Sequence, residues 1–205
     1  QGGIHRLHSR RPDDPPTAAV RGIYIAFGLA ALPAFLIYGI AGARRAAEYN
    51  EPIVLWRQVV IDQPQSYVAH HGLAVRLYTE GRLEEAVAHY RKALEKKSDH
   101  AEAQYGLGLA LLHLGRPREA IEPLRVVVRL KPDAERIRNN LGVALFSAGQ
   151  YEEAIAVFEE VLDCNPQMWE AHDNLGRALR QAGRDDDARK HFDEAARLQR
   201  ELAGD

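Results

Sequence analysis

The sequence predicts an all-α protein with a single N-terminal transmembrane helix followed by an α-solenoid of helix–turn–helix repeats. Two observations predict this fold. One residue pattern returns every 34 positions, in the windows 67–100, 101–134, 135–168 and 169–202. Upstream of these windows, residues 22–43 contain no charged side chain. A period of about 20 to 50 residues is typical of stacked supersecondary units, and an uncharged stretch of this length can span a bilayer.

Composition limits the classes of function open to the chain. Of its 205 residues, 46% are hydrophobic and 27% charged, so the chain is not disordered by composition. The formal net charge of −2 argues against nucleic acid as the main partner. Cys164 is the only cysteine, which excludes a disulfide framework, a cysteine-based zinc site and a haem-attachment motif within one chain.

The first 66 residues divide into a tail, a membrane helix and a connection. Residues 1–19 combine prolines, glycines and charges and are expected to form an extended tail. We expect residues 20–43 to form the transmembrane helix, because 22 apolar residues at about 1.5 Å each cover a bilayer core of about 30 Å. A cleaved signal peptide ending at 41–43 is the alternative, but its apolar region would span only about 7–15 residues. Residues 44–66 connect this helix to the repeats.

Two further features of the membrane helix bear on its topology and contacts. Four arginines precede it and three follow it closely, which places the N-terminus in the cytoplasm and the repeats outside it, in the periplasm of a Gram-negative source. Small residues recur every four positions, a spacing that lets another helix pack closely in lipid; they are Gly22, Ala26, Ala30 and Ala34. The frequency of small residues in membrane helices explains this spacing equally well.

Each 34-residue window contains two helical patterns, here called helix A and helix B, around a glycine at its fifteenth place. In the third window the pattern predicts helix A over 135–148 and helix B over 151–164, ended by Asn165-Pro166. Small residues at places eight and twenty let the two helices approach, and a larger residue at place twenty-four fills the contact. The same register predicts a lone helix B over 51–63 that caps the first repeat. Pro123, inside helix B of the second window, predicts a kink.

These motifs resemble the tetratricopeptide repeat family. The third window has the sequence NNLGVAL, then GQYEEAI, a phenylalanine and a proline, and the fourth has NLGRAL, GRDDDA and a phenylalanine. The resemblance covers 67–202, and residues 203–205 are left as a tail. Place four, usually aromatic in the family, departs from it in all windows and holds His70, Gln104, Arg138 and His172.

The resemblance implies that helix A lines a concave groove. The predicted groove residues are apolar and aromatic in the first half and charged at the far end: Val75, Tyr78, Tyr105, Leu109, Leu112, Val143, Phe146, Arg177 and Arg180. Such a groove favours an amphipathic or extended protein segment as partner. Alternatively, its first half packs on residues 1–20 or on the bilayer surface. The carboxylate clamp of some family members is missing, because the corresponding places hold His71, Val75 and Tyr105.

No residue pattern indicates catalysis, a metal or a cofactor. The nine histidines show no pair with metal-ligand spacing and a third ligand, and are interpreted as surface or half-exposed residues. Cys164 is interpreted as a packed small residue. Asp185, Asp186 and Asp187 open a helix, where carboxylates favour the dipole. No nucleophile, base and orienting group occur together.

The sequence therefore predicts a non-catalytic, membrane-anchored scaffold with protein partners and the lipid bilayer as its contacts. We expect an accessory subunit of a membrane protein complex or an assembly factor for one. The alternative is a biogenesis or secretion factor, for cytochrome c maturation, pilus assembly or outer-membrane assembly, that binds transient clients in the groove.

Overall fold

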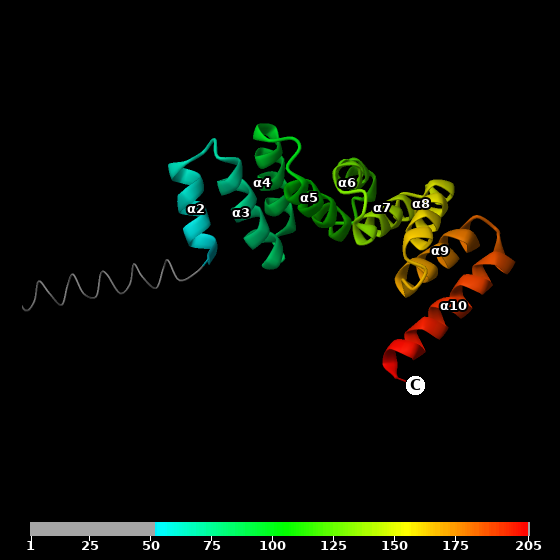
Figure 1. The fold of residues 1–205 in the computed structure, drawn as a ribbon. Coiled ribbons are helices and arrows are strands. Elements are labelled where there is room, and N and C mark those ends of the chain that lie inside the picture. The colour runs from blue at the N-terminus through cyan, green and yellow to red at the C-terminus, as the bar shows by residue number, and fades with distance from the viewer. Residues whose placement is uncertain (1–51, 205) are drawn as a thin grey trace, which may run out of the picture. The chain divides into compact units, whose positions relative to one another are not determined.

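The computed structural model describes residues 52–204, which form an all-α array (Figure 1). Its helices, in chain order, are α2 (Pro52–Asp62), α3 (Tyr67–Thr79), α4 (Leu83–Lys96), α5 (Ala101–His113), α6 (Pro117–Leu130), α7 (Glu135–Ser147), α8 (Tyr151–Cys164), α9 (Trp169–Gln181) and α10 (Asp185–Ala203). The predicted membrane helix, residues 20–43, lies outside the described residues. Within 52–204, no helix is long and apolar enough to cross a membrane.

The turn inside each repeat depends on a glycine. Gly149 joins α7 to α8 with a φ of 82°, a left-handed conformation that costs glycine little and other residues more. Its N–H donates to the carbonyl of Phe146 at 3.0 Å, and the next N–H, of Gln150, donates to Leu145 at 2.9 Å. The equivalent glycines also have positive φ: Gly81, Gly115 and Gly183. The glycine at place fifteen therefore ends helix A and forms the turn that leads into helix B.

Helices A and B of one repeat meet at a glycine without a side chain. A Cβ atom added to Gly142 on α7 would lie 2.4 Å from the ring of Phe158 on α8. Phe158 is fully buried, as is Ala154 one turn before it. Gly108 against Leu124 and Gly176 against Phe192 repeat this arrangement in the neighbouring windows. The small residues at places eight and twenty thus admit the larger residue at place twenty-four.

In the lone helix α2 and in the first repeat, the residue at place twenty-four packs against the following helix A. A Cβ atom on Gly72 would lie 2.4 Å from the ring of Trp56, and one on Gly106 would lie 2.4 Å from the ring of Tyr90. Both glycines hold place six of the next helix A. The lone helix α2 thereby packs on α3 through Trp56, together with the buried Ile53.

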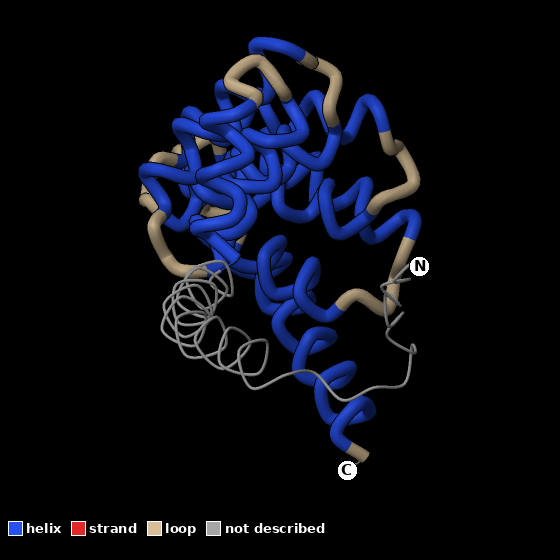
Figure 2. The backbone as a smooth tube through the Cα atoms, turned by 90° about the vertical axis from the view of Figure 1, so that its left-hand side faces the viewer, coloured by secondary structure: helices blue, strands red, loops and turns tan. Residues whose placement is uncertain are grey.

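The helices A lie on the inner side of a curved array. Successive helices pack in chain order, with short loops between them (Figure 2). Helices A of neighbouring repeats also touch one another, as α3 touches α5, α5 touches α7 and α7 touches α9. Within residues 52–204, no equivalent contact joins α4 to α6, α6 to α8 or α8 to α10. Because helices A are closer together than helices B, the array is concave on the helix A side.

Pro123 does not end the helix that contains it. Helix α6 is continuous from Pro117 to Leu130. Since proline has no N–H, the carbonyl of Glu119 lacks its helical donor there. The kink expected at Pro123 stays a prediction.

A candidate protein-binding groove

The structure distributes the predicted groove residues over four helices A. Val75 and Tyr78 lie on α3, followed by residues of α5, α7 and α9. The apolar and aromatic members are half-buried, whereas Arg177 and Arg180 are exposed. Six of them pack against the edge of the core, namely Val75, Tyr78, Tyr105, Leu112, Val143 and Phe146. Each of these six combines a fixed position with a face left open to solvent.

Lateral hydrogen bonds connect neighbouring helices A. The amide of Asn140 on α7 donates to the hydroxyl of Tyr105 on α5 at 2.9 Å, and that of Asn174 on α9 donates to Oδ1 of Asn139 on α7 at 3.2 Å. In the first half, the Tyr78 hydroxyl lies 3.2 Å from a ring nitrogen of His113. These bonds fix the helices A relative to one another before any partner arrives. The sequence interpretation missed them, although asparagines at places five and six were their signal.

Two arginines at the far end of the groove are held by aromatic rings. The guanidinium of Arg177 lies 5.4 Å from the ring centre of Phe146, and that of Arg180 lies 5.4 Å from that of Phe192. These distances are within the range of cation–π attraction. Neither arginine has a carboxylate within 4.0 Å among the residues that the structure describes. The pair therefore presents two positioned positive charges that can bind a carboxylate of a partner.

The hydroxyl of Tyr78, in the first half of the groove, remains protonated at neutral pH. Burial raises the pKa of Tyr78, and the nearby Tyr105 raises it further. A protonated phenol both donates and accepts hydrogen bonds. Tyr78 can therefore bind a polar backbone group with the hydroxyl while the ring contacts an apolar side chain.

The departure from the family pattern at place four has a structural reason. In every window the residue there donates a hydrogen bond to a backbone carbonyl six residues earlier, in the loop that enters the repeat. The four contacts are His70 Nε2 to Pro64 at 3.1 Å, Gln104 Nε2 to Ser98 at 2.8 Å, Arg138 Nη2 to Pro132 at 2.6 Å and His172 Nε2 to Pro166 at 3.1 Å. Place four thus requires an N–H donor that ties helix A to the preceding loop.

Two interpretations of single residues were wrong. His70 is buried and not a surface histidine, since only 4% of it is exposed. Its burial is tolerated because both ring nitrogens have partners. Cys164 is exposed and not packed, because place thirty of helix B points away from the helix A layer. Its sulfur lies 3.8 Å from a guanidinium nitrogen of Arg138.

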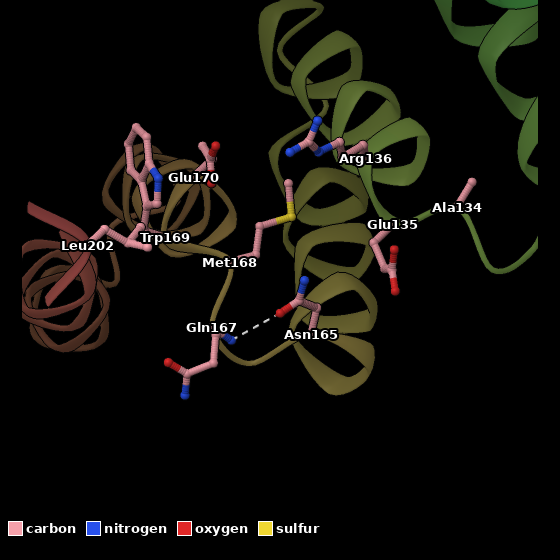
Figure 3. Close-up of a pocket in the computed structure, with 9 residues that line it drawn as sticks. All are labelled: Ala134, Glu135, Arg136, Asn165, Gln167, Met168, Trp169, Glu170 and Leu202. Atoms are coloured by element: carbon pink, nitrogen blue, oxygen red, sulfur yellow. Dashed lines mark hydrogen bonds between the residues drawn. The ribbon is translucent and has the colours of Figure 1, made fainter.

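A separate pocket of about 500 Å³ lies where the third and fourth repeats meet (Figure 3). Met168, Trp169 and Leu202 give it an apolar surface, and Arg136 and Glu170 add charged groups. Helix α10 has 19 residues, whereas α4, α6 and α8 each have 14, and its longer end brings Leu202 beside the start of α9. The sequence interpretation missed this pocket. Within residues 52–204, no group of three histidine, cysteine or acidic side chains could hold a metal ion.

Known proteins share both the repeat and the fold. The family model described as tetratricopeptide repeat matches residues 71–135, 127–168 and 139–203. None of the curated proteins compared with the chain matches it.

Among solved structures, a crystal structure of MamA is 23% identical and superposes with a TM-score of 0.70, covering 79% of this chain and 95% of that one. A second MamA structure is 25% identical, with a TM-score of 0.68 and coverages of 75% and 91%. YrrB, described as a TPR protein with an unusual peptide-binding site, is 22% identical, with a TM-score of 0.69 and coverages of 81% and 82%.

The match of the family model covers more than half of the chain, and the paired helices and their glycine turns supply its structural basis. The resemblance seen in the sequence is thereby confirmed. The chain belongs to the tetratricopeptide repeat family, whose members are scaffolds for protein–protein interaction.

Proposed function

We propose that the chain is a non-catalytic scaffold that holds a protein segment in its concave groove beside a membrane. The observation that carries this proposal is the row of half-buried apolar and aromatic side chains along α3, α5 and α7. It ends on α9 at Arg177 and Arg180, which have no carboxylate partner within residues 52–204. A peptide-binding site in a TPR protein of the same fold, YrrB, supports the same use of the array.

The groove chemistry defines the segment that fits. Apolar side chains of the partner would contact Tyr78, Tyr105 and Leu112, where burial of apolar area stabilises the complex. A carboxylate of the partner would lie at Arg177 and Arg180. The proposed partner is therefore an extended or helical segment that is apolar at one end and acidic at the other.

The membrane part of the proposal comes from the sequence. Residues 20–43 are proposed as an uncleaved transmembrane helix with the repeats on the extracytoplasmic side, and its small residues as a contact with other membrane helices. The full chain should then stay with membrane vesicles after an alkaline wash. Ala30→Arg, which places a charge in the centre of the span, should release a substantial fraction of the chain. Equal retention of both would remove the membrane helix from the proposal.

The groove is tested by capture of partners from native membranes in mild detergent. Tyr105→Asp with Phe146→Asp should abolish capture and keep the helical circular dichroism. Leu130→Asp is the matched control, because Leu130 is 47% exposed on α6, a helix B outside the groove. Equal capture by the groove variant and the control would disprove the proposed site.

The proteins captured also distinguish the two roles. A stoichiometric set of integral membrane proteins that survives a salt wash would identify an accessory subunit of a membrane complex. Substoichiometric soluble or secreted clients would identify an assembly or biogenesis factor. Loss of either set in the groove variant alone would place the contact in the groove and not on the membrane helix.

A further inference from the structure

Two pairs of histidines, one in the first repeat and one in the last, have the same geometry. The Nδ1 atoms of His70 and His89 lie 2.9 Å apart, and those of His172 and His191 lie 3.0 Å apart. In both pairs the ring centres are 5.2 Å apart and the ring planes differ by 29°. Because the nitrogens are so much closer than the ring centres, the rings meet end to end through a hydrogen bond and do not stack face to face. Each pair joins helix A to helix B.

The hydrogen bonds define where the protons are. Nε2 of His70 lies 3.1 Å from the carbonyl oxygen of Pro64, and a carbonyl only accepts. The proton of neutral His70 is therefore on Nε2, and its Nδ1 carries a lone pair. His89 must then donate its Nδ1–H to that lone pair. The same reasoning applies to His172, Pro166 and His191. Each pair holds one proton between two Nδ1 atoms.

This geometry fits a proton better than a metal ion. Bonds from zinc to histidine nitrogen are about 2.0–2.1 Å long, so an ion on the line between two Nδ1 atoms would need them about 4 Å apart. The observed separations are 2.9 and 3.0 Å. Away from that line, the two lone pairs would not point at the ion.

We propose that the two histidine pairs are pH-sensitive joints that loosen the first and last repeats when a pair takes up a second additional proton. The first additional proton can bind Nε2 of His89 or His191, which leaves the Nδ1 bond intact. The second must bind Nδ1 of His70 or His172. It would place two N–H groups and two positive charges against each other, so helices A and B must separate there.

Positive charges surround the first joint more closely than negative ones. Arg57 on α2 and Lys92 on α4 face it, opposed by Glu85 on α4. Glu95 and Lys96 of α4 line the same cleft as His70. Burial lowers the pKa of His89, and His70 and Lys92 lower it further. Uptake of protons at this joint is therefore disfavoured.

Carboxylates predominate around the last joint. Burial lowers the pKa of His191, and His172 and Lys190 lower it further. Glu159 on α8 and Asp187 on α10 act in the opposite direction and raise it. Arg197 lowers the pKa of Glu194 on α10 most, and the rings of His172 and His191 lower it further. These carboxylates favour the protonated form, so the last joint should loosen at a higher pH than the first.

The inner repeats contain no such joint. The places that hold the paired histidines are occupied by Gln104 and Pro123 in the second repeat and by Arg138 and Val157 in the third. None of these side chains titrates between about pH 5 and pH 8. A fall in pH should therefore act through these joints on the ends of the array and leave the third repeat, which has no histidine, unchanged.

Amide hydrogen exchange of the full chain in detergent tests the joints, with each rate divided by its intrinsic rate at the same pH. Between about pH 7.5 and about pH 5, protection of α9 and α10 should fall by roughly tenfold, the factor that one pKa unit represents. Protection of α3 and α4 should fall less, and that of α7 and α8 should stay constant. An equal fall in α7 and α8 would overturn the proposal.

His172→Gln is the matched variant, because Gln104 shows that glutamine at this place keeps the bond to the loop carbonyl. The variant should lose the response of α9 and α10 and keep that of α3 and α4, and His70→Gln should do the reverse. A response that persists in α9 and α10 of His172→Gln would overturn the proposal. So would a response that disappears with a chelator, since it would assign the pairs to a metal.

A second measurement needs no variant. Nitrogen NMR of the histidine rings at about pH 8 should find the proton on Nε2 in His172 and on Nδ1 in His191. The opposite tautomers would contradict the hydrogen bonds on which the joint depends, whether or not the glutamine variants fold.

Discussion

The ring at place twenty-four meets a glycine of a different helix A in the first repeat and in the third. In the first repeat, Tyr90 lies against Gly106 of the following repeat, whereas in the third repeat Phe158 lies against Gly142 of its own. In the first repeat, place eight of helix A is Ala74, which is fully buried. The position of the glycine therefore decides which helix A lets the ring approach its backbone.

This difference also shapes the groove. Where place six of helix A is Gly106, the ring of Tyr90 packs against it and joins the first repeat to the second. Glycine adds no side chain to the groove at that place. Where place six is Asn140 or Asn174, the coupling passes through hydrogen bonds on the groove surface. Place six therefore adds no polar side chain to the groove at Gly106 and adds an amide at Asn140 and Asn174.

The largest expected effect comes from removing the ring that joins two helices of one repeat. Phe158→Ala should lower the free energy of unfolding by about 3–5 kcal/mol, because the ring is fully buried and leaves a cavity. Phe192→Ala should cost less, since Phe192 is only partly buried in the last repeat. Urea denaturation followed by circular dichroism measures both. Equal losses would show that burial does not distinguish the third repeat from the last.

The next effect comes from filling the space beside that ring. Gly142→Leu should lower the free energy of unfolding by roughly 1–3 kcal/mol, because even its Cβ would lie 2.4 Å from the ring of Phe158. Alanine favours the helix by about 0.8–1.0 kcal/mol over glycine and leucine by slightly less, which offsets only part of this cost. A neutral result in the same denaturation experiment would contradict the packing of place eight against place twenty-four.

A double-mutant cycle separates the two directions of packing. Phe158→Ala should partly rescue Gly142→Leu, since it removes the atoms with which the leucine collides. Tyr90→Ala should instead partly rescue Gly106→Leu, because Tyr90 lies against Gly106. Absence of coupling between Tyr90 and Gly106 would remove the distinction between the first and third repeats.

The sequence predicted the local features of the fold and missed those that depend on contacts between residues far apart in the sequence. The turn at Gly149 was predictable, because an αL position after helix A has few alternatives to glycine. The contact of Tyr90 with Gly106 was not, because these two residues belong to different repeats. The same holds for His70, whose partners are a ring nineteen residues later and a loop carbonyl.

The candidate groove was also predictable only in part. Its residues follow from the helix A register, so Tyr105 and Phe146 could be assigned to it from the sequence. The lateral bond from Asn174 to Asn139 required the distance between two helices 35 residues apart, which no periodicity supplies. Asparagine was therefore interpreted only as a polar residue of the family signature.

Alkaline pH provides a smaller and reversible way to act on the first half alone. Burial raises the pKa of Tyr90 to about 12, and the neighbouring Tyr78 adds to this rise. Since the unfolded tyrosine loses its proton at about pH 10, the stabilisation that Tyr90 provides is complete below about pH 10 and decreases as the pH rises toward 12. Tyr90→Phe should remove this part of the alkaline destabilisation in thermal unfolding. Phe158→Tyr, its counterpart in the second half, should introduce one.

The smallest effect should come from the lateral bonds of the second half. Asn174→Ala should lower the free energy of unfolding by about 1 kcal/mol, because it leaves Oδ1 of the buried Asn139 without its donor. Asn140→Ala should cost less, since the Tyr105 hydroxyl it releases is only half-buried and can bind water. If the asparagine hydrogen bonds on the groove surface fix the helices A of this half, amide hydrogen exchange in α9 should be faster in Asn174→Ala. A rise confined to α3 and α4 would show that the rings of the core, and not the asparagines, hold both halves together.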